Sequence, residues 1–257
     1  MSIHIDDIMD IAVQAGTLVL ENGGETYRAE ETCVRIAKAL GANNASAFVT
    51  PTVLIVSILD KDRHGHTTMN RITNRSVNLR KIAQINDLSR RLAKRGKAVD
   101  PRVVERLLDR IRTAPDHSFF GLALMGGFAG FFFALMFGCS FLQALCAFVI
   151  GLLLRIMLLV LEKSGLNTFI LSALSGGLVS ALCEIFFVLH IVPVSMEIMT
   201  AALMQVVPGL AIVNAIRDLI SGDLMSGTAR LVEAFMIAAG LSIGSIFGVL
   251  VFSHVII

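Results

Sequence analysis

The sequence predicts an α-helical polytopic membrane protein with about five transmembrane helices and an N-terminal cytoplasmic α+β domain. Three observations carry this prediction. The chain of 257 residues is 55% apolar, which exceeds the usual composition of a soluble domain. Its charges are uneven, because residues 1–117 hold 18 of the 22 Lys and Arg residues and 14 of the 20 Asp and Glu residues. Residues 118–257 contain apolar runs of about 20 residues, long enough to cross a hydrocarbon core about 30 Å thick.

Helical periodicity and turn residues define the first two elements of the N-terminal domain. Apolar residues from Ile8 to Val19 recur at helical spacing. The triplet Asn22-Gly23-Gly24 ends this helix, because glycine tolerates the left-handed conformation that closes many helices. A second helix is expected from Glu25 to Leu40. The stretch GGETYRAEE at its start gathers charged side chains, which suits either a small-ligand or docking site or a solvated first turn.

The middle of this domain is predicted to be a β-hairpin. The runs FVTPTVLIVSILD and GHTTMNRIT are rich in strand-forming residues and flank a turn at KDRHGH. Pro51 inside the first run indicates a strand edge or a bulge. A third helix is marked by apolar residues from Val77 to Leu92, and a fourth starts at the Asp100-Pro101 cap. The expected order is therefore α-α-β-β-α-α.

Five transmembrane spans are expected in residues 118–257. The loop between the second and third spans carries Glu162 and Lys163, and the loop between the fourth and fifth carries Arg217 and Arg230. The other two loops hold no Lys or Arg. The N-terminus shows no signal peptide. The positive-inside rule then predicts a protein of the inner (plasma) membrane with its N-terminus in the cytoplasm and its C-terminus on the outer side. The expected spans are Phe119–Gly138, Phe141–Leu161, Asn167–His190, Ser195–Ile216 and Leu231–Ile257.

The fourth span is interrupted, and the interruption marks the candidate substrate site. Pro208 removes one backbone donor and Gly209 relaxes the chain, so the freed carbonyl groups need protein or water as partners. Broken helices near the midplane of the membrane are how many secondary transporters bind small solutes. The alternative is a proline kink with no part in transport. The candidate substrate-binding residues are Pro208, Gly209, Asn214, Arg217, Asp218 and Arg230.

Glu184, within the third span, is the candidate proton-coupling residue. A carboxylate at this depth is costly unless it is protonated, paired or hydrated. The alternative is an acid that snorkels toward water or is locally hydrated. Small residues also recur at every fourth position of three spans and predict close helix packing, within one chain or between chains. They are Gly126 and Gly130, then Ser172, Gly176 and Ser180, then Gly240, Gly244 and Gly248.

Several classes of function find no support in the sequence. The four cysteines form no CxxC pair, and His64 and His66 lack an evident third ligand, so neither a metal site nor a cofactor is expected. No catalytic triad, P-loop or nucleotide fingerprint occurs, so the chain is not expected to be an enzyme. The basic stretch before the first span lacks interleaved aromatic residues, which favours contact with anionic lipid over nucleic acid.

Two motifs resemble the signature of the threonine/serine exporter family. The stretch VPGLAIVNAIRDLISGDLMSGTARLVEAFMIAAGLSIG runs from Val-Pro-Gly through Asn, Arg-Asp, Ser-Gly-Asp and Ser-Gly-x-x-Arg to a span rich in small residues. The stretch ENGGETYRAEETCVRIAKALG resembles the helix-turn-helix near the N-terminus of that family. The two motifs occur in the expected order about 180 residues apart.

The resemblance implies a secondary exporter of threonine and serine, and some split relatives in the family are linked to dicarboxylate export. Full-length members resemble two five-span halves, whereas split members carry the second half in a separate, smaller subunit. This chain is similar to the first half with its soluble domain, which implies the larger subunit of a split, hetero-oligomeric exporter. An odd number of spans would insert a following five-span unit in the opposite orientation, as in inverted-repeat transporters.

The sequence thus favours a proton-coupled exporter of a small hydrophilic amino acid or a small carboxylate, acting in the lipid bilayer with a second five-span membrane subunit. Arg217 or Arg230 would hold a carboxylate, and Asp218 would pair with one of them or with an amino group. The alternative is a non-transporting membrane scaffold or regulator that acts through its cytoplasmic domain. Co-purification of a small five-span partner would favour the exporter, whereas a soluble partner on residues 1–117 would favour the scaffold.

Overall fold

The computed structural model describes residues 4–60, 63–74, 76–95, 99–115, 118–193 and 196–256, with only the backbone for Lys163 and residues 252–256. The chain divides into two compact units. The first comprises Met1–Pro115 and Val213–Arg230, and the second comprises Asp116–Ile212 and Leu231–Ile257. Part of the predicted turn, Lys61-Asp62, and the predicted span ends Ser195 and Ile257 lie outside the described residues.

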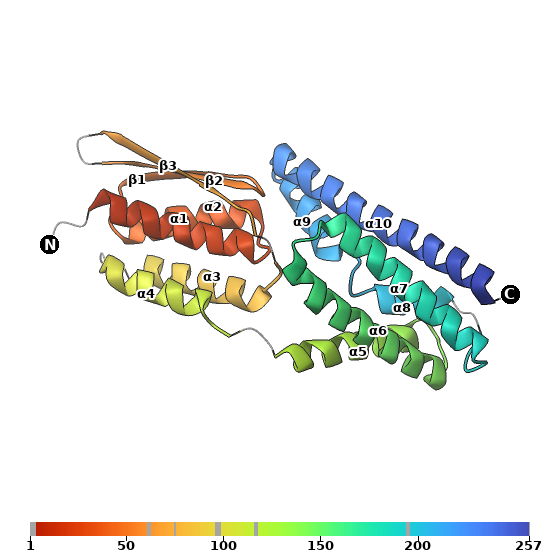
Figure 1. Ribbon diagram of the computed structural model, residues 1–257. Coiled ribbons are helices and arrows are strands. Elements are labelled where there is room, and N and C mark those ends of the chain that lie inside the picture. Colours follow the sequence, from red (N-terminus) through yellow and green to blue (C-terminus); the bar gives the residue numbers. More distant parts are fainter. Residues whose placement is uncertain are drawn as a thin grey trace. The chain divides into compact units, whose positions relative to one another are not determined.

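Four helices of the first unit form two layers beside a sheet (Figure 1). Figure 1 shows α1 and α2 between the sheet and the layer of α3 and α4. The fourth helix begins as the sequence predicts, because the Asp100 side chain accepts a hydrogen bond from the Arg102 amide and Pro101 occupies the first turn. The helices are α1 (Ile5–Glu21), α2 (Thr26–Ala39), α3 (Leu79–Lys94) and α4 (Pro101–Arg112).

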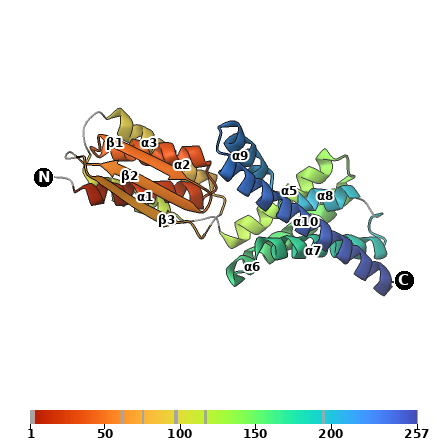
Figure 2. The ribbon, with the colours of Figure 1, turned by 90° about the horizontal axis from the view of Figure 1, so that it is seen from above.

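The sheet has three antiparallel strands in the order β1-β2-β3 (Figure 2). They are β1 (Asn44–Val49), β2 (Val53–Leu59) and β3 (Gly65–Arg71). The predicted hairpin corresponds to β2 and β3, but the prediction of two strands was wrong, because the first β-rich run is divided between β1 and β2. Pro51 stands in the turn between these strands, where its missing amide hydrogen takes nothing from the strand ladder.

The core of the first unit lies on both sides of α1 and α2, because buried residues of the sheet and of α3 and α4 belong to the same cluster. Alternate residues of β2 are buried, as expected for a strand with one face on the core. These are Leu54, Val56 and Ile58, and the helices contribute Ala12, Ala15, Val19, Ala29 and Ile36 to the same cluster. The first unit therefore has a hydrophobic core of its own.

The first unit also contains the end of α9 (Gly209–Ile220) and the start of α10 (Leu224–Ile256). The sequence-based boundary at residue 117 groups these segments with the membrane domain, whereas residues 213–230 pack with the N-terminal part of the chain. Their polarity explains the difference. Asp218 and Arg230 are 0% and 9% exposed, and buried charges need partners, which residues 24–26 supply.

Four helices in the described part of the chain are long and apolar enough to cross a membrane. Three of them, α5 (Phe119–Met136), α6 (Phe141–Leu161) and α7 (Thr168–Val188), match predicted spans, and the fourth is the Leu224–Val251 part of α10. The chain is thus a helical polytopic membrane protein, and its described residues hold four helices of this length rather than the five predicted spans. The segment predicted as the remaining span consists of α8 (Met196–Leu203) and α9, each too short to cross a bilayer alone.

The interruption between α8 and α9 has a local cause. Proline lacks an amide hydrogen, and α9 begins at Gly209, directly after Pro208. The Pro208 carbonyl then accepts the first hydrogen bond of α9, from the Ile212 amide at 3.0 Å. The side chain of Gln205 attaches the non-helical segment to α6, because its Nε2 donates to the Gly151 carbonyl at 3.1 Å. Protein therefore covers the Gln205 side of the break, whereas Val207, beside Pro208, is 44% exposed.

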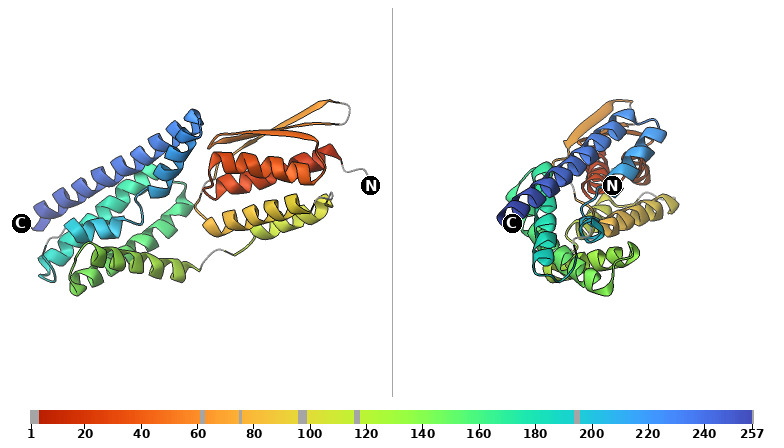
Figure 3. Two further views of the ribbon diagram at one scale, coloured as in Figure 1. Left: turned by 180° about the vertical axis from the view of Figure 1, so that it is seen from behind. Right: turned by 90° about the vertical axis from the view of Figure 1, so that its right-hand side faces the viewer.

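Small residues bring the helices of the second unit into backbone contact (Figure 3). A β-carbon at Gly130 of α5 would lie 2.5 Å from the Ala147 carbonyl oxygen of α6. A β-carbon at Gly240 of α10 would lie 2.7 Å from the Phe169 carbonyl oxygen of α7. Neither position has space for a side chain, so the predicted small-residue faces pack within the chain, α5 against α6 and α7 against α10.

Candidate functional site

The turn between α1 and α2 presents backbone carbonyls and two polar side chains from one short segment. Asn22 closes α1, and its Nδ2 donates to the Leu18 carbonyl at 2.7 Å. Gly23 follows with a φ of 86°, a conformation that favours glycine. The Gly24 amide then donates back to the Val19 carbonyl at 2.9 Å, and α2 begins at Thr26. These hydrogen bonds fix residues 22–26 at the edge of the unit's core. We call this segment the NGGET turn after its sequence.

The facing structure is the hairpin of α9 and α10. Asn214, Arg217 and Asp218 lie three and four residues apart, so they share one face of α9. Gly222, at a φ of 92°, turns the chain into α10, which contributes Ser226 and Arg230 from positions four apart. Helical spacing on both sides therefore directs the polar side chains of the hairpin toward one region.

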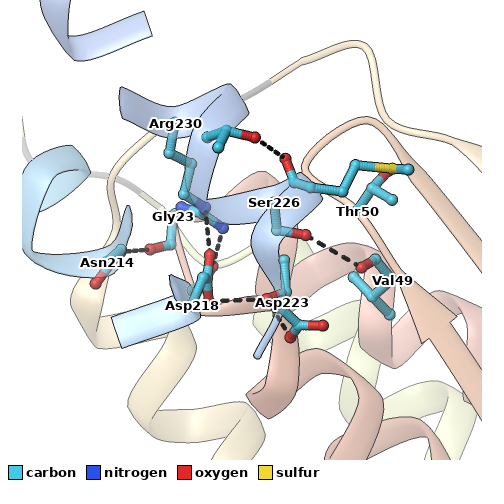
Figure 4. Close-up of polar contacts among 12 residues, drawn as sticks. Gly23, Val49, Thr50, Asn214, Asp218, Asp223, Ser226 and Arg230 are labelled. Carbon is cyan, nitrogen blue, oxygen red and sulfur yellow. Dashed lines mark hydrogen bonds and ion pairs between the residues drawn. The ribbon is translucent and has the colours of Figure 1, made fainter. Parts of the chain in front are cut away.

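The hairpin and the NGGET turn bind each other through four groups. Figure 4 shows three of these groups, Asn214, Asp218 and Arg230, near Gly23. The Asn214 Nδ2 donates to the Gly23 carbonyl at 3.2 Å, and the Arg230 Nη2 donates to the Gly24 carbonyl at 2.8 Å. The Arg217 Nη1 lies 2.7 Å from the Glu25 Oε1. The Thr26 hydroxyl donates to the Asp218 Oδ1 at 2.8 Å, while the Asp218 Oδ2 lies 3.1 Å from the Arg230 Nε. We call these residues the polar cluster, together with Asp223, whose Oδ2 lies 3.4 Å from the Thr26 hydroxyl, and Ser226, which bonds to the Val49 carbonyl.

The electrostatics of the polar cluster are unusual for a packing contact. Burial raises the pKa of Asp218, although the Thr26 hydroxyl and the Arg230 guanidinium oppose the rise. The desolvation of a buried ion pair often costs more free energy than its attraction returns. A buried acid with a raised pKa that lies among charged groups is a candidate for a binding site. Chemically, the arginines can hold a carboxylate, and Asp218 and Asp223 can accept a hydrogen bond from a hydroxyl or an ammonium group.

The polar cluster contains four of the predicted site residues but not all of them. It brings Asn214, Arg217, Asp218 and Arg230 together. The other predicted residues belong to the second unit, and the structure does not add them to the cluster. Pro208 and Gly209 precede the portion of α9 that belongs to the first unit, and Glu184 is a half-buried residue of α7.

Sequence reasoning missed the other half of the polar cluster. It noted Glu25 as part of a charged helix start, but it did not identify Thr26, the carbonyl groups of the two glycines or Ser226, whose hydroxyl lies 3.5 Å from the Val49 carbonyl oxygen. The hydrogen bond between Thr26 and Asp218 joins residues 192 positions apart. Helical and strand periodicities relate residues only a few positions apart, so they cannot indicate such a distant pair. The only signal available was that both segments are short polar motifs beside apolar helices.

Comparison with known proteins assigns the chain to a family. The ThrE family model, described as "Putative threonine/serine exporter", matches residues 10–252. The chain is 23% identical over 255 residues to the "Threonine/serine exporter" of Corynebacterium glutamicum and 22% identical over 245 residues to the "Probable threonine/serine exporter" of Mycobacterium tuberculosis. It is also 20% identical over 237 residues to the "Probable succinate transporter subunit YjjP" of Escherichia coli. No solved structure matches the chain.

The lengths of these relatives differ. The alignments cover 96% and 94% of this chain for the two exporters, but only 51% and 46% of the exporters themselves. The chain therefore spans about half the length of these relatives. By contrast, the alignment with the succinate transporter subunit covers 91% of this chain and 90% of that protein. The match over residues 10–252 and the four apolar helices lead to one conclusion: the chain belongs to the ThrE family of threonine/serine exporters, a family of membrane transporters.

Proposed function

We propose that this chain is one part of a secondary-active exporter that moves threonine, serine or a small carboxylate out across the plasma membrane. The polar cluster is the observation that carries this proposal. It places two arginines and two aspartates, which can hold both ends of a zwitterion, on a helix hairpin whose second helix continues as an apolar span. The names of the relatives, two exporters and a transporter subunit, support the same role.

The exporter is proposed to be a hetero-oligomer with a second five-span subunit. This chain spans about half of the two exporters and nine-tenths of a protein named as a subunit, which supports a split arrangement. We propose that α8 and the first turn of α9 together make a fifth crossing. The charged loops then lie on the cytoplasmic side with the N-terminus, and the C-terminus lies outside. A partner inserted in the opposite orientation would complete an inverted repeat.

Proton coupling is proposed to involve Glu184. This carboxylate lies within α7, and no ion pair joins it to another residue in the ranges that the structure describes. An acid in that position is a candidate proton carrier, because protonation removes the cost of its charge in the membrane. Glu184→Gln mimics the protonated state. It should retain exchange of labelled substrate but lose acceleration by a proton gradient, and retention of that acceleration would remove Glu184 from the coupling.

The test of transport is counterflow of labelled threonine, serine and succinate in liposomes that contain this chain with and without its partner subunit. Arg217→Ala should reduce counterflow at least about tenfold, because a charged hydrogen bond to a carboxylate contributes about 1.5–3 kcal/mol. The fold should tolerate the change, because Glu25 keeps Arg28 as a partner at 2.9 Å. Arg35→Ala removes an exposed pair with Glu31 and is the matched control. Full counterflow by Arg217→Ala would refute its role.

A second candidate function is a non-transporting scaffold or regulator. The observation that favours it is that Arg217, Asp218 and Arg230 already bind groups of this chain. In that case the polar cluster is a structural joint, and the domain built from α1–α4 binds a soluble partner. A folded complex that shows no counterflow of any of the three solutes, and that captures a soluble protein through residues 4–115, would favour this function over the exporter.

A further inference from the structure

Two groups of the NGGET turn occupy the α9–α10 side of the polar cluster. Glu25 and Thr26 are neighbours in sequence, and together they present one carboxylate and one hydroxyl group. The carboxylate lies 2.7 Å from the Arg217 guanidinium, and the hydroxyl donates to the Asp218 carboxylate at 2.8 Å. A free threonine or serine carries the same two groups. This comparison rests on the proposed function, because it assumes that the polar cluster binds the transported molecule.

The binding of Thr26 has the features of recognition rather than of chance contact. Thr26 and Asp218 are both fully buried, so the hydroxyl meets the carboxylate away from water. A buried carboxylate that loses its hydrogen-bond donor pays a large desolvation penalty. A site of this kind therefore discriminates strongly between a molecule with the hydroxyl and the same molecule without it.

The charges leave room for the third group of a free amino acid, its ammonium. The Thr26 hydroxyl has one hydrogen, which it donates to Asp218, and the Asp223 Oδ2 lies farther away, at 3.4 Å. The Asp223 carboxylate therefore receives at most a weak hydrogen bond from the NGGET turn. If a zwitterion replaced Glu25 and Thr26, its carboxylate would restore the charge of Glu25 at Arg217, and its ammonium would add a positive charge that Asp223 can accept.

Displacement of Glu25 from Arg217 does not remove every charged partner of its carboxylate. Glu25 has a second partner in its own helix, because the Arg28 Nε lies 2.9 Å from the Glu25 Oε2. A displaced Glu25 therefore keeps an ion pair. On the other side, the Arg217 side chain is 55% exposed, so a small solute can reach it while the turn is in place. When the substrate carboxylate replaces that of Glu25, Arg217 pairs with the substrate and Arg28 keeps Glu25. Neither of these two arginines is then left unpaired.

We propose that the Glu25-Thr26 pair is an internal ligand of the polar cluster that the transported hydroxy amino acid displaces, with Arg217 holding the carboxylate and Asp218 selecting for the hydroxyl. The turn competes with substrate, so weakening the turn strengthens substrate binding. Asp218 is thereby assigned as a specificity-determining residue, and Asp223 as the partner of the substrate ammonium.

The test uses a cysteine in the turn as a reporter of displacement. Cys139, Cys146 and Cys183 are replaced by alanine, and the buried Cys33 is retained. Thr26→Cys is then labelled with a maleimide in the complex of this chain and its partner subunit. The residue is fully buried when the turn is in place, so displacement exposes it. Tyr27→Cys is the matched control, because Tyr27 is the next residue, is 37% exposed and takes no part in the polar cluster.

Threonine should accelerate the labelling of Thr26→Cys at least about tenfold and leave Tyr27→Cys unchanged. The same effect with 2-aminobutyrate, which is threonine without its hydroxyl, should need about 10- to 100-fold higher concentrations. Glu25→Gln, added to the Thr26→Cys variant, should lower the threonine concentration required, because the internal competitor is weaker. A purely structural turn would give an unchanged or a higher concentration, and either result would overturn the proposal.

Counterflow measured on the same preparations tests the proposed function separately from the internal ligand. Threonine counterflow with no change in the labelling of Thr26→Cys would refute the internal ligand and leave the exporter standing. Equal potency of threonine and 2-aminobutyrate would refute the role of Asp218. Absence of both counterflow and accelerated labelling in a folded complex would refute the proposed function together with the inference.

Discussion

Two adjacent glycines of α7 provide a sharp test of the packing of the second unit. A β-carbon at Gly176 would overlap the Leu241 carbonyl oxygen of α10 and lie 2.8 Å from the Ser245 amide nitrogen. A β-carbon at Gly177 would meet nothing closer than the Gly244 carbonyl oxygen, at 3.5 Å. Gly176→Ala should therefore force α7 and α10 apart, whereas Gly177→Ala should be accommodated.

The expected difference in the free energy of unfolding follows from the effects that the two substitutions share and the one that they do not. Both substitutions gain about 0.5–1 kcal/mol of helix propensity, and this gain cancels when the two variants are compared. The remaining difference is the cost of forcing a methyl group between two backbones, about 1–3 kcal/mol. Since backbone atoms cannot rotate away, α10 must move by about 1 Å or more to bring the Leu241 carbonyl oxygen to an ordinary contact distance.

The assay is thermal unfolding of the detergent-solubilised protein, followed by circular dichroism at the helix band. For a chain of this size, 1 kcal/mol corresponds to about 2–4 °C, so the Tm of Gly176→Ala should lie about 2–12 °C below that of Gly177→Ala. Gly177→Ala should match or exceed the unsubstituted protein. A Tm for Gly176→Ala equal to or above that of Gly177→Ala would refute the inferred contact between α7 and α10.

Three further predictions concern the first unit. Burial raises the pKa of the Cys33 thiol to about 12. A maleimide at pH 8 should therefore label it more than about 1000-fold more slowly than an ordinary cysteine until the protein is denatured. Fast labelling of the native protein in a mass-spectrometric time course would contradict this burial. Gly24→Ala should lower the Tm through a loss of about 1–3 kcal/mol, because a β-carbon there would lie 2.9 Å from the Val19 carbonyl oxygen; an unchanged Tm would show that the turn has room. Burial raises the pKa of both Glu30 and Asp218, so the folded unit binds more protons than the unfolded chain in the range between their ordinary and raised pKa values, and its free energy of unfolding should fall as the pH rises through that range. Asp218→Asn should make that fall shallower in unfolding measured from pH 4 to pH 8, and an identical pH profile would argue against its raised pKa.

Local patterns in the sequence were sufficient for most of the helices. The α1 stripe, the Asn22-Gly23-Gly24 stop and the Asp100 cap each act within one or two turns, so the sequence alone locates these boundaries closely. The strands were harder. The residues around Pro51 all favour extended backbone and so predict one strand, whereas the chain reverses at the proline to make β1 and β2.

Long-range pairing was beyond the reach of the sequence patterns. Apolar composition indicated that α8 and α9 belong to a span, but it did not show that the end of α9 joins the first unit. Similarly, the crowding of Arg217 and Asp218 after a broken helix indicated a candidate site without revealing its contents. Which groups fill that site depends on Thr26 and the carbonyls of Gly23 and Gly24, whose positions are set by a different part of the fold.

The pairing of Thr26 with Asp218 also has a consequence for biosynthesis. The two residues are separated by 192 positions, and at about 5–20 residues per second the ribosome needs about 10–40 seconds to produce the second after the first. Helices α5, α6 and α7 are translated in that interval. The N-terminal segment therefore leaves the ribosome before its NGGET turn can bind α9 and α10. It lacks these partners while most of the apolar helices enter the bilayer. Arg28, only three residues from Glu25, is available from the start and can hold that carboxylate until Arg217 arrives.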